Sequence, residues 1–166
     1  MATTYEKIAS ITLGDNSSSF YFENIPATYT DLRIVITGRS TANGVNLLTT
    51  FNGDSGSSNY SNTMLRGNGT TASSERLTNF GYFNILQAGF HTTNTHLFTI
   101  DVFSYAASIF KTCLFTASED NNGSGSILHQ VGLWRSTSAI TSVAFQTNTG
   151  QMLAGTTTTL YGILKA

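Results

Sequence analysis

Residues Leu133 to Leu164, LWRSTSAITSVAFQTNTGQMLAGTTTTLYGIL, give the clearest indication of the fold. Their β-branched and aromatic residues predict two strands, Ile140–Phe145 and Thr157–Leu164, joined by a loop that contains Gly and Asn. Because unpaired backbone groups are costly to bury, an apolar terminal strand predicts a sheet in which it is paired. We expect the two strands to be the closing pair at the edge of a β-sandwich, with Trp134-Arg135 at the corner leading into it.

The same alternation of short apolar runs and polar turns continues along the rest of the chain. One proline, Pro26, and no sustained helical periodicity favour an all-β fold. We expect a single domain, residues 1–166, built as an antiparallel, jelly-roll-like β-sandwich of about 8–10 strands, with residues 1–4 compatible with a flexible N-terminal arm. The remaining strands are expected at Thr4–Leu13, Ser19–Glu23, Asp31–Gly38, Val45–Phe51, Tyr60–Arg66, Arg76–Leu86, His96–Phe103, Ile109–Ala117 and Ile127–Trp134.

Three local patterns give more specific expectations. Asp31–Gly38 alternates between apolar and polar residues, and the turn dipeptide Asn43-Gly44 predicts that it forms a hairpin with Val45–Phe51. Ser118–Ser126 predicts a polar hairpin tip. The segment from Asn52 to Asn94 is the least regular part of the chain, and irregular loops on a rigid sheet are where binding residues usually lie.

Composition excludes several classes of partner. Charged residues make up 10% of the chain and the net charge is −1, so nothing steers the protein toward nucleic acid or an anionic membrane. Polarity comes instead from Ser, Thr, Asn and Gly, whose neutral groups cost less to desolvate than ions do. Such a surface suits packing against copies of the same chain or a larger lattice. The N-terminus MATTYEKIAS predicts no signal peptide, so we expect an intracellular protein unless it leaves as part of a particle.

No motif predicts a catalytic site. Gly53–Ser57 resembles the nucleophile segment of chymotrypsin-type serine proteases, but all three histidines follow Ser55, whereas that fold places its His and Asp before the serine. A Gly/Ser turn is the better interpretation. Gly67-x-Gly69 resembles part of a dinucleotide loop but opens no predicted helix. We therefore expect no enzyme activity and no catalytic residues.

Metal and cofactor sites are likewise not predicted. The carboxylates are isolated apart from Glu119-Asp120, and Asp120–Gly123 lacks the spacing of a calcium loop, so a hairpin tip is the better interpretation. Cys113 is the single cysteine and lies in an apolar run, which predicts a small buried side chain and not a reactive thiol. We expect no metal and no cofactor.

Aromatic and arginine side chains are the candidates for a binding surface or subunit interface. Tyrosine and tryptophan favour both sugar-binding grooves and protein contacts, and core packing is the alternative for each. For Trp134-Arg135 the two interpretations are equally weighted, and Tyr21 and Tyr29 are further aromatic candidates. The candidate interface or binding residues are Tyr5, Tyr60, Arg66, Tyr82, Trp134 and Arg135.

Several motifs in the same order resemble a family of small virion structural proteins encoded by tailed bacteriophages. The resemblance covers most of the chain and is weakest from about Arg76 to His96. It implies a jelly-roll-like β-sandwich displayed as a trimer on a capsid or tail, and it brings no catalytic residues. The motifs are MATTYEKIASITL at the N-terminus, Ile25–Arg33, Phe51–Asp54 followed by Asn59–Ser61, Gly132–Arg135, Ile140–Val143 and Leu160–Ile163.

The expected function is that of a non-enzymatic virion protein made in the host bacterial cytoplasm. We expect a capsid decoration or cement protein that sits as a symmetric homotrimer over the major capsid protein and adds buried area to the lattice. The alternative is a tip protein of a tail or head fibre that binds a host-surface glycan. In that case exposed tyrosines and the loops between Asn52 and Asn94 would contact the glycan.

Overall fold

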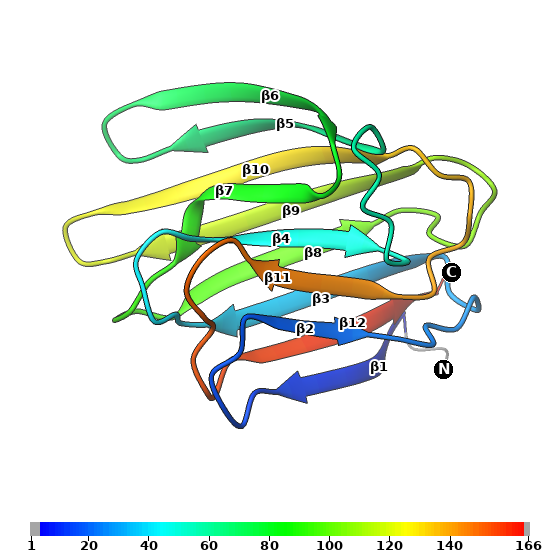
Figure 1. Cartoon of the computed structure of the whole chain (residues 1–166), viewed down its shortest axis with the longest axis horizontal. Helices are drawn as coiled ribbons and strands as arrows, with labels where there is room; N and C mark the ends of the chain where they lie inside the picture. The colour runs from blue at the N-terminus through cyan, green and yellow to red at the C-terminus, as the bar shows by residue number, and fades with distance from the viewer. Residues whose placement is uncertain (1–3, 165–166) are drawn as a thin grey trace.

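Two antiparallel β-sheets pack face to face in this protein (Figure 1). The structure is a computed structural model that describes residues 4–164, without the side chains of residues 86–89. It confirms the expected all-β, jelly-roll-like sandwich. The expected N-terminal arm lies outside the described residues apart from Thr4, whose carbonyl accepts a hydrogen bond from the Leu164 N–H at 3.0 Å.

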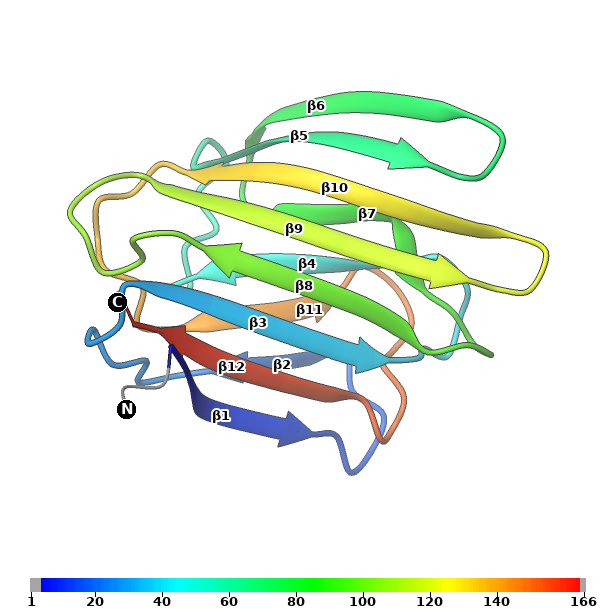
Figure 2. The same ribbon diagram turned by 180° about the vertical axis from the view of Figure 1, so that it is seen from behind.

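The described part of the chain contains twelve strands, more than the eight to ten expected. The larger sheet has eight strands in the order β1-β12-β3-β8-β9-β10-β5-β6, and Figure 2 shows it from outside. The smaller sheet has the order β2-β11-β4-β7. The strands are β1 (Tyr5–Thr12), β2 (Ser19–Phe22), β3 (Asp31–Gly38), β4 (Val45–Phe51), β5 (Tyr60–Gly67), β6 (Ala72–Phe80), β7 (Phe83–Phe90), β8 (His96–Val102), β9 (Lys111–Asp120), β10 (Gly125–Trp134), β11 (Val143–Thr147) and β12 (Thr157–Ile163).

The core lies between the two sheets and follows from strand alternation. In β3 the residues Leu32, Ile34 and Ile36 are fully buried, and the residues between them are only partly so. Successive side chains of a strand point to opposite faces, so the inward-facing residues of most strands join one continuous apolar cluster. Aromatic residues fill the space between the sheets, as in the close packing of Phe83 against Phe115.

The prediction of a closing strand pair at the end of the chain is wrong. β11 lies in the smaller sheet between β2 and β4, whereas β12 lies in the larger sheet between β1 and β3. The segment between them crosses from one sheet to the other, and the buried Met152 forms bridges with Ser17 and Ser40 on the way. The terminal strand is paired on both sides, as its apolar sequence requires, but it is not the edge of the sandwich.

The prediction of a hairpin around Asn43-Gly44 is also wrong, because the two strands lie in different sheets. β3 belongs to the larger sheet and β4 to the smaller one, so the turn carries the chain across the core. Gly44 has φ +72°, the left-handed conformation that glycine adopts readily. Both strands turn their buried faces toward the core from opposite sides. The dipeptide therefore predicted the turn but not the partner of either strand.

The segment between Asn52 and Asn94 is more regular than the sequence predicts. A single strand was expected at Arg76–Leu86, but β6 and β7 occupy this region and separate at Gly81-Tyr82. β6 forms a hairpin with β5 at the edge of the larger sheet, where nearly all of its side chains remain exposed (Figure 1). Because both faces of β6 are exposed, its sequence does not alternate between apolar and polar residues.

Candidate functional site

The most conspicuous aromatic residues of the sequence meet at one corner of the sandwich. Trp134 ends β10 and pairs with Tyr60, the first residue of β5. The Trp134 indole N–H donates to Asp54 Oδ2 at 2.7 Å, and the Tyr60 hydroxyl donates to the Asp54 carbonyl at 2.9 Å. The same hydroxyl accepts from the Phe51 N–H at 3.0 Å. Both aromatic side chains are buried, so each packs in the core and neither is exposed for an interface.

The Asp54 carboxylate organises the loop before β5. It accepts hydrogen bonds from the Gly56 N–H at 2.9 Å and from Asn59 Nδ2 at 2.8 and 2.9 Å, in addition to Trp134. Burial raises the pKa of Asp54, but these hydrogen bonds to the ionised form outweigh it and hold the pKa below the ordinary value. The ionised carboxylate is thus a structural anchor of the loop.

Arg135 completes this corner. Its backbone N–H donates to the Asn59 carbonyl at 2.8 Å and its Nη1 donates to the Ser58 carbonyl at 2.6 Å. We call Asp54, Asn59, Tyr60, Trp134 and Arg135 the Asp54 corner. Residues 54–60 and Trp134-Arg135 are far apart along the chain, and the hydrogen bonds of Asp54 and Arg135 hold the two segments together. Their polar groups are directed at the loop itself.

The serine of the protease-like segment lies far from the histidines at the loop end. Phe90 pairs with Val45 at the start of β4, so His91 lies at that end, whereas Ser55 lies beyond the other end. The seven residues of β4 span about 20 Å. His96 stacks near His91, at a ring separation of 6.1 Å. A catalytic triad centred on Ser55 would need a histidine within hydrogen-bond reach, and His91 and His96 lie at the opposite end of β4.

The other three candidate residues lie in separate places. Tyr5 is an exposed residue of the edge strand β1, packed edge-to-face on Tyr161. Arg66 is near the end of β5, beside the polar loops described next. Tyr82 lies in the turn between β6 and β7, on the outer side of the smaller sheet. The six predicted residues therefore do not form one site.

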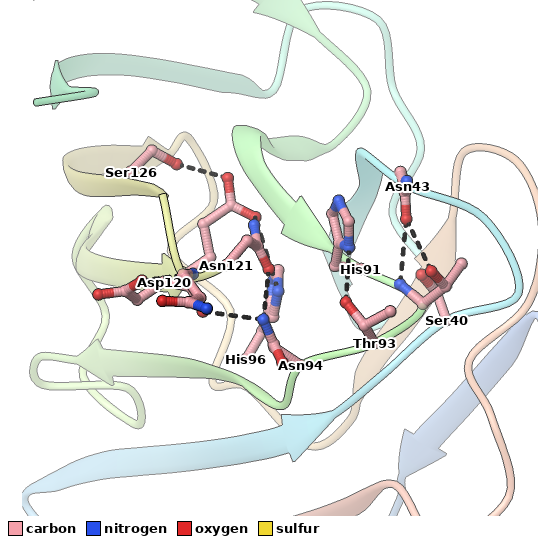
Figure 3. A network of polar contacts seen from close by, with 12 residues as sticks. Ser40, Asn43, His91, Thr93, Asn94, His96, Asp120, Asn121 and Ser126 are labelled. Atoms are coloured by element: carbon pink, nitrogen blue, oxygen red, sulfur yellow. Dashed lines mark hydrogen bonds and ion pairs between the residues drawn. The ribbon is translucent and has the colours of Figure 1, made fainter. Parts of the chain in front are cut away.

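A polar network closes the tip of the β9–β10 hairpin (Figure 3). Glu119 accepts hydrogen bonds from Ser126 Oγ at 2.9 Å and from Asn121 Nδ2 at 3.2 Å, and its Oε2 lies 3.5 Å from Nε2 of the buried His96. Asn94 Nδ2 donates to the Asp120 carbonyl and to Asn121 Oδ1, both at 3.1 Å. The carboxylate is thus engaged in holding the hairpin against β8.

A polar groove of about 620 Å³ lies beside this network, between the loops at the same end. Across the described residues, no three His, Cys, Asp or Glu side chains are placed to hold a metal ion. Asp120–Gly123 is the expected hairpin tip, closed by a 2.7 Å hydrogen bond from the Asn121 N–H to the Ser124 carbonyl. The groove is lined by Asn43, Gly44, Asn46, Arg66, Asn68, His91, Glu119, Asn121, Ser124 and Gly125.

The outer face of the eight-stranded sheet exposes several large apolar side chains. Leu65 is 58% exposed, Ile127 51% and Val131 48%, although all three lie within regular strands. The ladder places Val131 opposite Leu114 of β9. Leu97 of β8 lies in the row of Ile127, with Ser118 of β9 between them. We call Leu65, Leu97, Leu114, Ile127 and Val131 the outer apolar face.

The surroundings of the outer apolar face carry few charges. Arg76 of β6 lies beside Val131 and donates to Thr63 Oγ1 at 3.1 Å. Directly opposite its members in the ladder, apart from one another, are hydroxyl residues, Gly67, His129 and Asp101. Asp101 is neutralised by Arg33 in a bidentate ion pair with distances of 2.6 and 2.7 Å. His129 lies between Leu65 and Thr116 on the same face. Neutral hydroxyls cost little to desolvate, so the whole region can be covered by a partner at low cost.

Sequence reasoning missed the outer apolar face, although a signal for it was present. β10 carries apolar residues on both of its faces. Leu128 and Trp134 point inward, and Ile127 and Val131 point outward. A strand that is apolar on both faces is typical of a sheet covered on both sides. Here only the inner side is covered by the second sheet, which leaves the outer side available.

Comparisons with known proteins do not identify the chain. No protein-family description matches it, and no curated protein is significantly similar to it. Among the described residues, no helix is long and apolar enough to cross a membrane.

Proposed function

We propose that this chain is a non-enzymatic structural protein of a tailed-bacteriophage virion that decorates the capsid as a homotrimer. The observation that carries the proposal is the outer apolar face, a set of exposed aliphatic side chains with few charges around them on four neighbouring strands of one sheet. Monomeric proteins rarely leave contiguous apolar patches larger than a few hundred Å² exposed, and larger ones mark interaction sites. The resemblance of the sequence to phage virion proteins supports the same role.

The occupant of the outer apolar face is a second copy of the chain. Its members lie on regular strands, so it needs no rearrangement before association. The low charge of the whole chain, with 10% charged residues and a net charge of −1, means that copies do not repel one another strongly. The trimer then contacts the major capsid protein through its remaining surface, and the contact is repeated over the lattice.

The physical effect of such a protein is added buried area. A stable protein–protein interface buries about 1,600 Å². One such contact at each lattice junction contributes modestly, but repetition over the capsid opposes the outward pressure of the packaged DNA. The role needs no reacting group, in keeping with the structural use of the Asp54 carboxylate and of Glu119.

The proposal is tested on particles of the phage that encodes the chain. Particles lacking the protein are supplied with the wild type or with the double variant Leu65→Lys, Val131→Lys, and are then challenged by heat or osmotic shock. We expect the wild type to restore resistance and the double variant to fail, because two ammonium groups would have to be buried. Asp15→Lys with Thr149→Lys, at two exposed bends outside the strands, serves as the matched substitution control.

Two results would overturn the proposal. Particles that lack the protein and resist the challenge as well as complete particles would rule out a cement role. Full rescue by the double variant would show that the outer apolar face is not the contact between copies. Imaging of the complete particles locates the protein directly and distinguishes a capsid position from a tail position.

A further inference from the structure

A second surface feature lies on the opposite side of the molecule, over the four-stranded sheet. A trough of about 370 Å³ is formed there by β2, β11, β4 and the turn between β6 and β7. This volume falls in the range of small-molecule sites, about 300–1,000 Å³. The trough is lined by Ser19, Phe20, Tyr21, Leu48, Thr50, Ser55, Gly81, Tyr82, Ala144, Phe145 and Gln146.

Two tyrosines bound the trough, and small residues form its floor. Tyr21 on β2 is 60% exposed and pairs with Ala144, which pairs in turn with Thr50 of β4. Tyr82 lies beyond β4, in the turn before β7. A row that runs from an aromatic residue over Ala and Thr to a second aromatic residue leaves a hollow with an aromatic side chain at each end. Such ends suit a flat ligand with apolar C–H groups.

The turn that carries Tyr82 is held in place. The Tyr82 ring packs edge-to-face with Phe80 at 5.8 Å. The next residue back, Gly81, approaches the Ser55 carbonyl so closely that a Cβ there would lie 2.5 Å from the oxygen. The loop of the Asp54 corner therefore supports this wall of the trough, and the Tyr82 side is fixed before any ligand arrives.

The remaining lining groups are neutral hydrogen-bonding groups. Ser19, Thr50, Ser55 and Gln146 supply hydroxyls and an amide, and no Asp, Glu, Lys or Arg lines the trough. These groups match a ligand rich in hydroxyls and without charge.

We propose that the trough binds a neutral saccharide, with one pyranose ring over Ala144 and Thr50 between Tyr21 and Tyr82. The C–H face of the ring would lie against a tyrosine, and its equatorial hydroxyls would reach Gln146 and the nearby hydroxyl groups. A trough of this size takes a ring or two and not a helix or a protein surface. It lies on the sheet opposite the outer apolar face, so either function can fail without the other.

The test is a saccharide-binding measurement on the full chain. The protein is applied to an array of neutral and anionic bacterial-surface glycans, and a retained glycan is then titrated by calorimetry against wild type and variants. We expect neutral glycans to be retained and Tyr21→Ala to weaken binding by about tenfold or more, because the stacking face is lost. Tyr21→Phe keeps the ring and is expected to bind within a few-fold of wild type.

Control variants separate a binding effect from a loss of fold. Tyr5→Ala removes a similarly exposed tyrosine from the other sheet and should leave the affinity unchanged. Ala144→Leu fills the floor of the trough and should abolish binding, with the melting temperature confirming that each variant is folded. Retention of anionic glycans alone or of none, or equal affinity for Tyr21→Ala and wild type, would overturn the inference.

Discussion

The Asp54 corner and the outer apolar face are built on the same two strands, β5 and β10, and they behave in opposite ways. At the corner, Tyr60 and Trp134 point inward and each polar group is paired within the chain. On the outer face, Leu65 and Val131 point outward and have no covering layer. A rare residue such as tryptophan can therefore be required by the fold, while common aliphatic residues form the surface available to a partner.

The largest effect expected from breaking the corner is that of Asp54→Ala. It removes the acceptor of the Trp134 indole N–H and of the Asn59 amide and the Gly56 N–H. Hydrogen bonds to charged groups contribute about 1.5–3 kcal/mol, so we expect the free energy of unfolding to fall by about 3 kcal/mol in urea titrations. The matched control Asp15→Ala, in an exposed turn, should change it by less than about 0.5 kcal/mol. Equal losses for both variants would contradict the structural role of Asp54.

Gly132→Ala tests the packing at the inner face of β10. A Cβ at this position would lie 2.5 Å from Phe83 Cε1 and 2.9 Å from Phe115 Cε2, and both rings are buried. Overpacking of this kind costs about 1–3 kcal/mol. Thermal unfolding should show the loss, whereas Gly67→Ala, where the nearest atom is 3.7 Å away, should be close to neutral. A neutral Gly132→Ala would mean that the two rings are not packed on the strand backbone.

A smaller effect is expected from acid at the corner. The folded-state pKa of Asp54 lies below its ordinary value of 3.8, so between the two values the unfolded chain binds more protons. Its contribution is present above the ordinary pKa and is lost as pH falls through the folded value. The difference in unfolding free energy between wild type and Asp54→Asn should therefore shrink as pH falls from about 6 to 2. A constant difference over this range would contradict the assignment.

The smallest effect on stability is expected at the outer apolar face. Leu65→Lys and Val131→Lys replace side chains that are 58% and 48% exposed, and surface substitutions usually change stability by less than about 0.5 kcal/mol. Urea titration of the double variant should therefore resemble the wild type at concentrations where both are monomeric. A loss comparable with that of Asp54→Ala would show that the face is part of the folding core.

Local pattern predicted most of the strands but not which strands pair. Alternation identified the buried side of β3, and the turn residues identified the tip between β9 and β10. The Asn43-Gly44 turn is compatible with a hairpin and with a crossing between sheets, because both need only a reversal of the chain. The partner is decided by packing of the apolar faces across the core, which the sequence near the turn does not contain.

The candidate surfaces were harder to predict than the fold. Trp134 and Tyr60 attract notice as interface residues, but the carboxylate that holds their polar groups inside, Asp54, is distant from Trp134 in sequence. The outer apolar face depends on cross-strand neighbours such as Val131 and Leu114, which become adjacent only once the register is known. Tyr21 and Tyr82 are likewise distant in sequence, and they line one trough only because the smaller sheet places β2 and the turn before β7 on either side of it.

The most direct test of the proposed assembly face is the mass of the protein in solution. Sedimentation velocity of the wild type and of the Leu65→Lys, Val131→Lys variant is compared over a range of concentrations, with the folded Asp54→Asn variant as control. We expect wild type and Asp54→Asn to sediment as trimers and the double lysine variant as a monomer. A wild type that stays monomeric at high concentration, or a double variant that remains trimeric, would contradict the assignment of the outer apolar face.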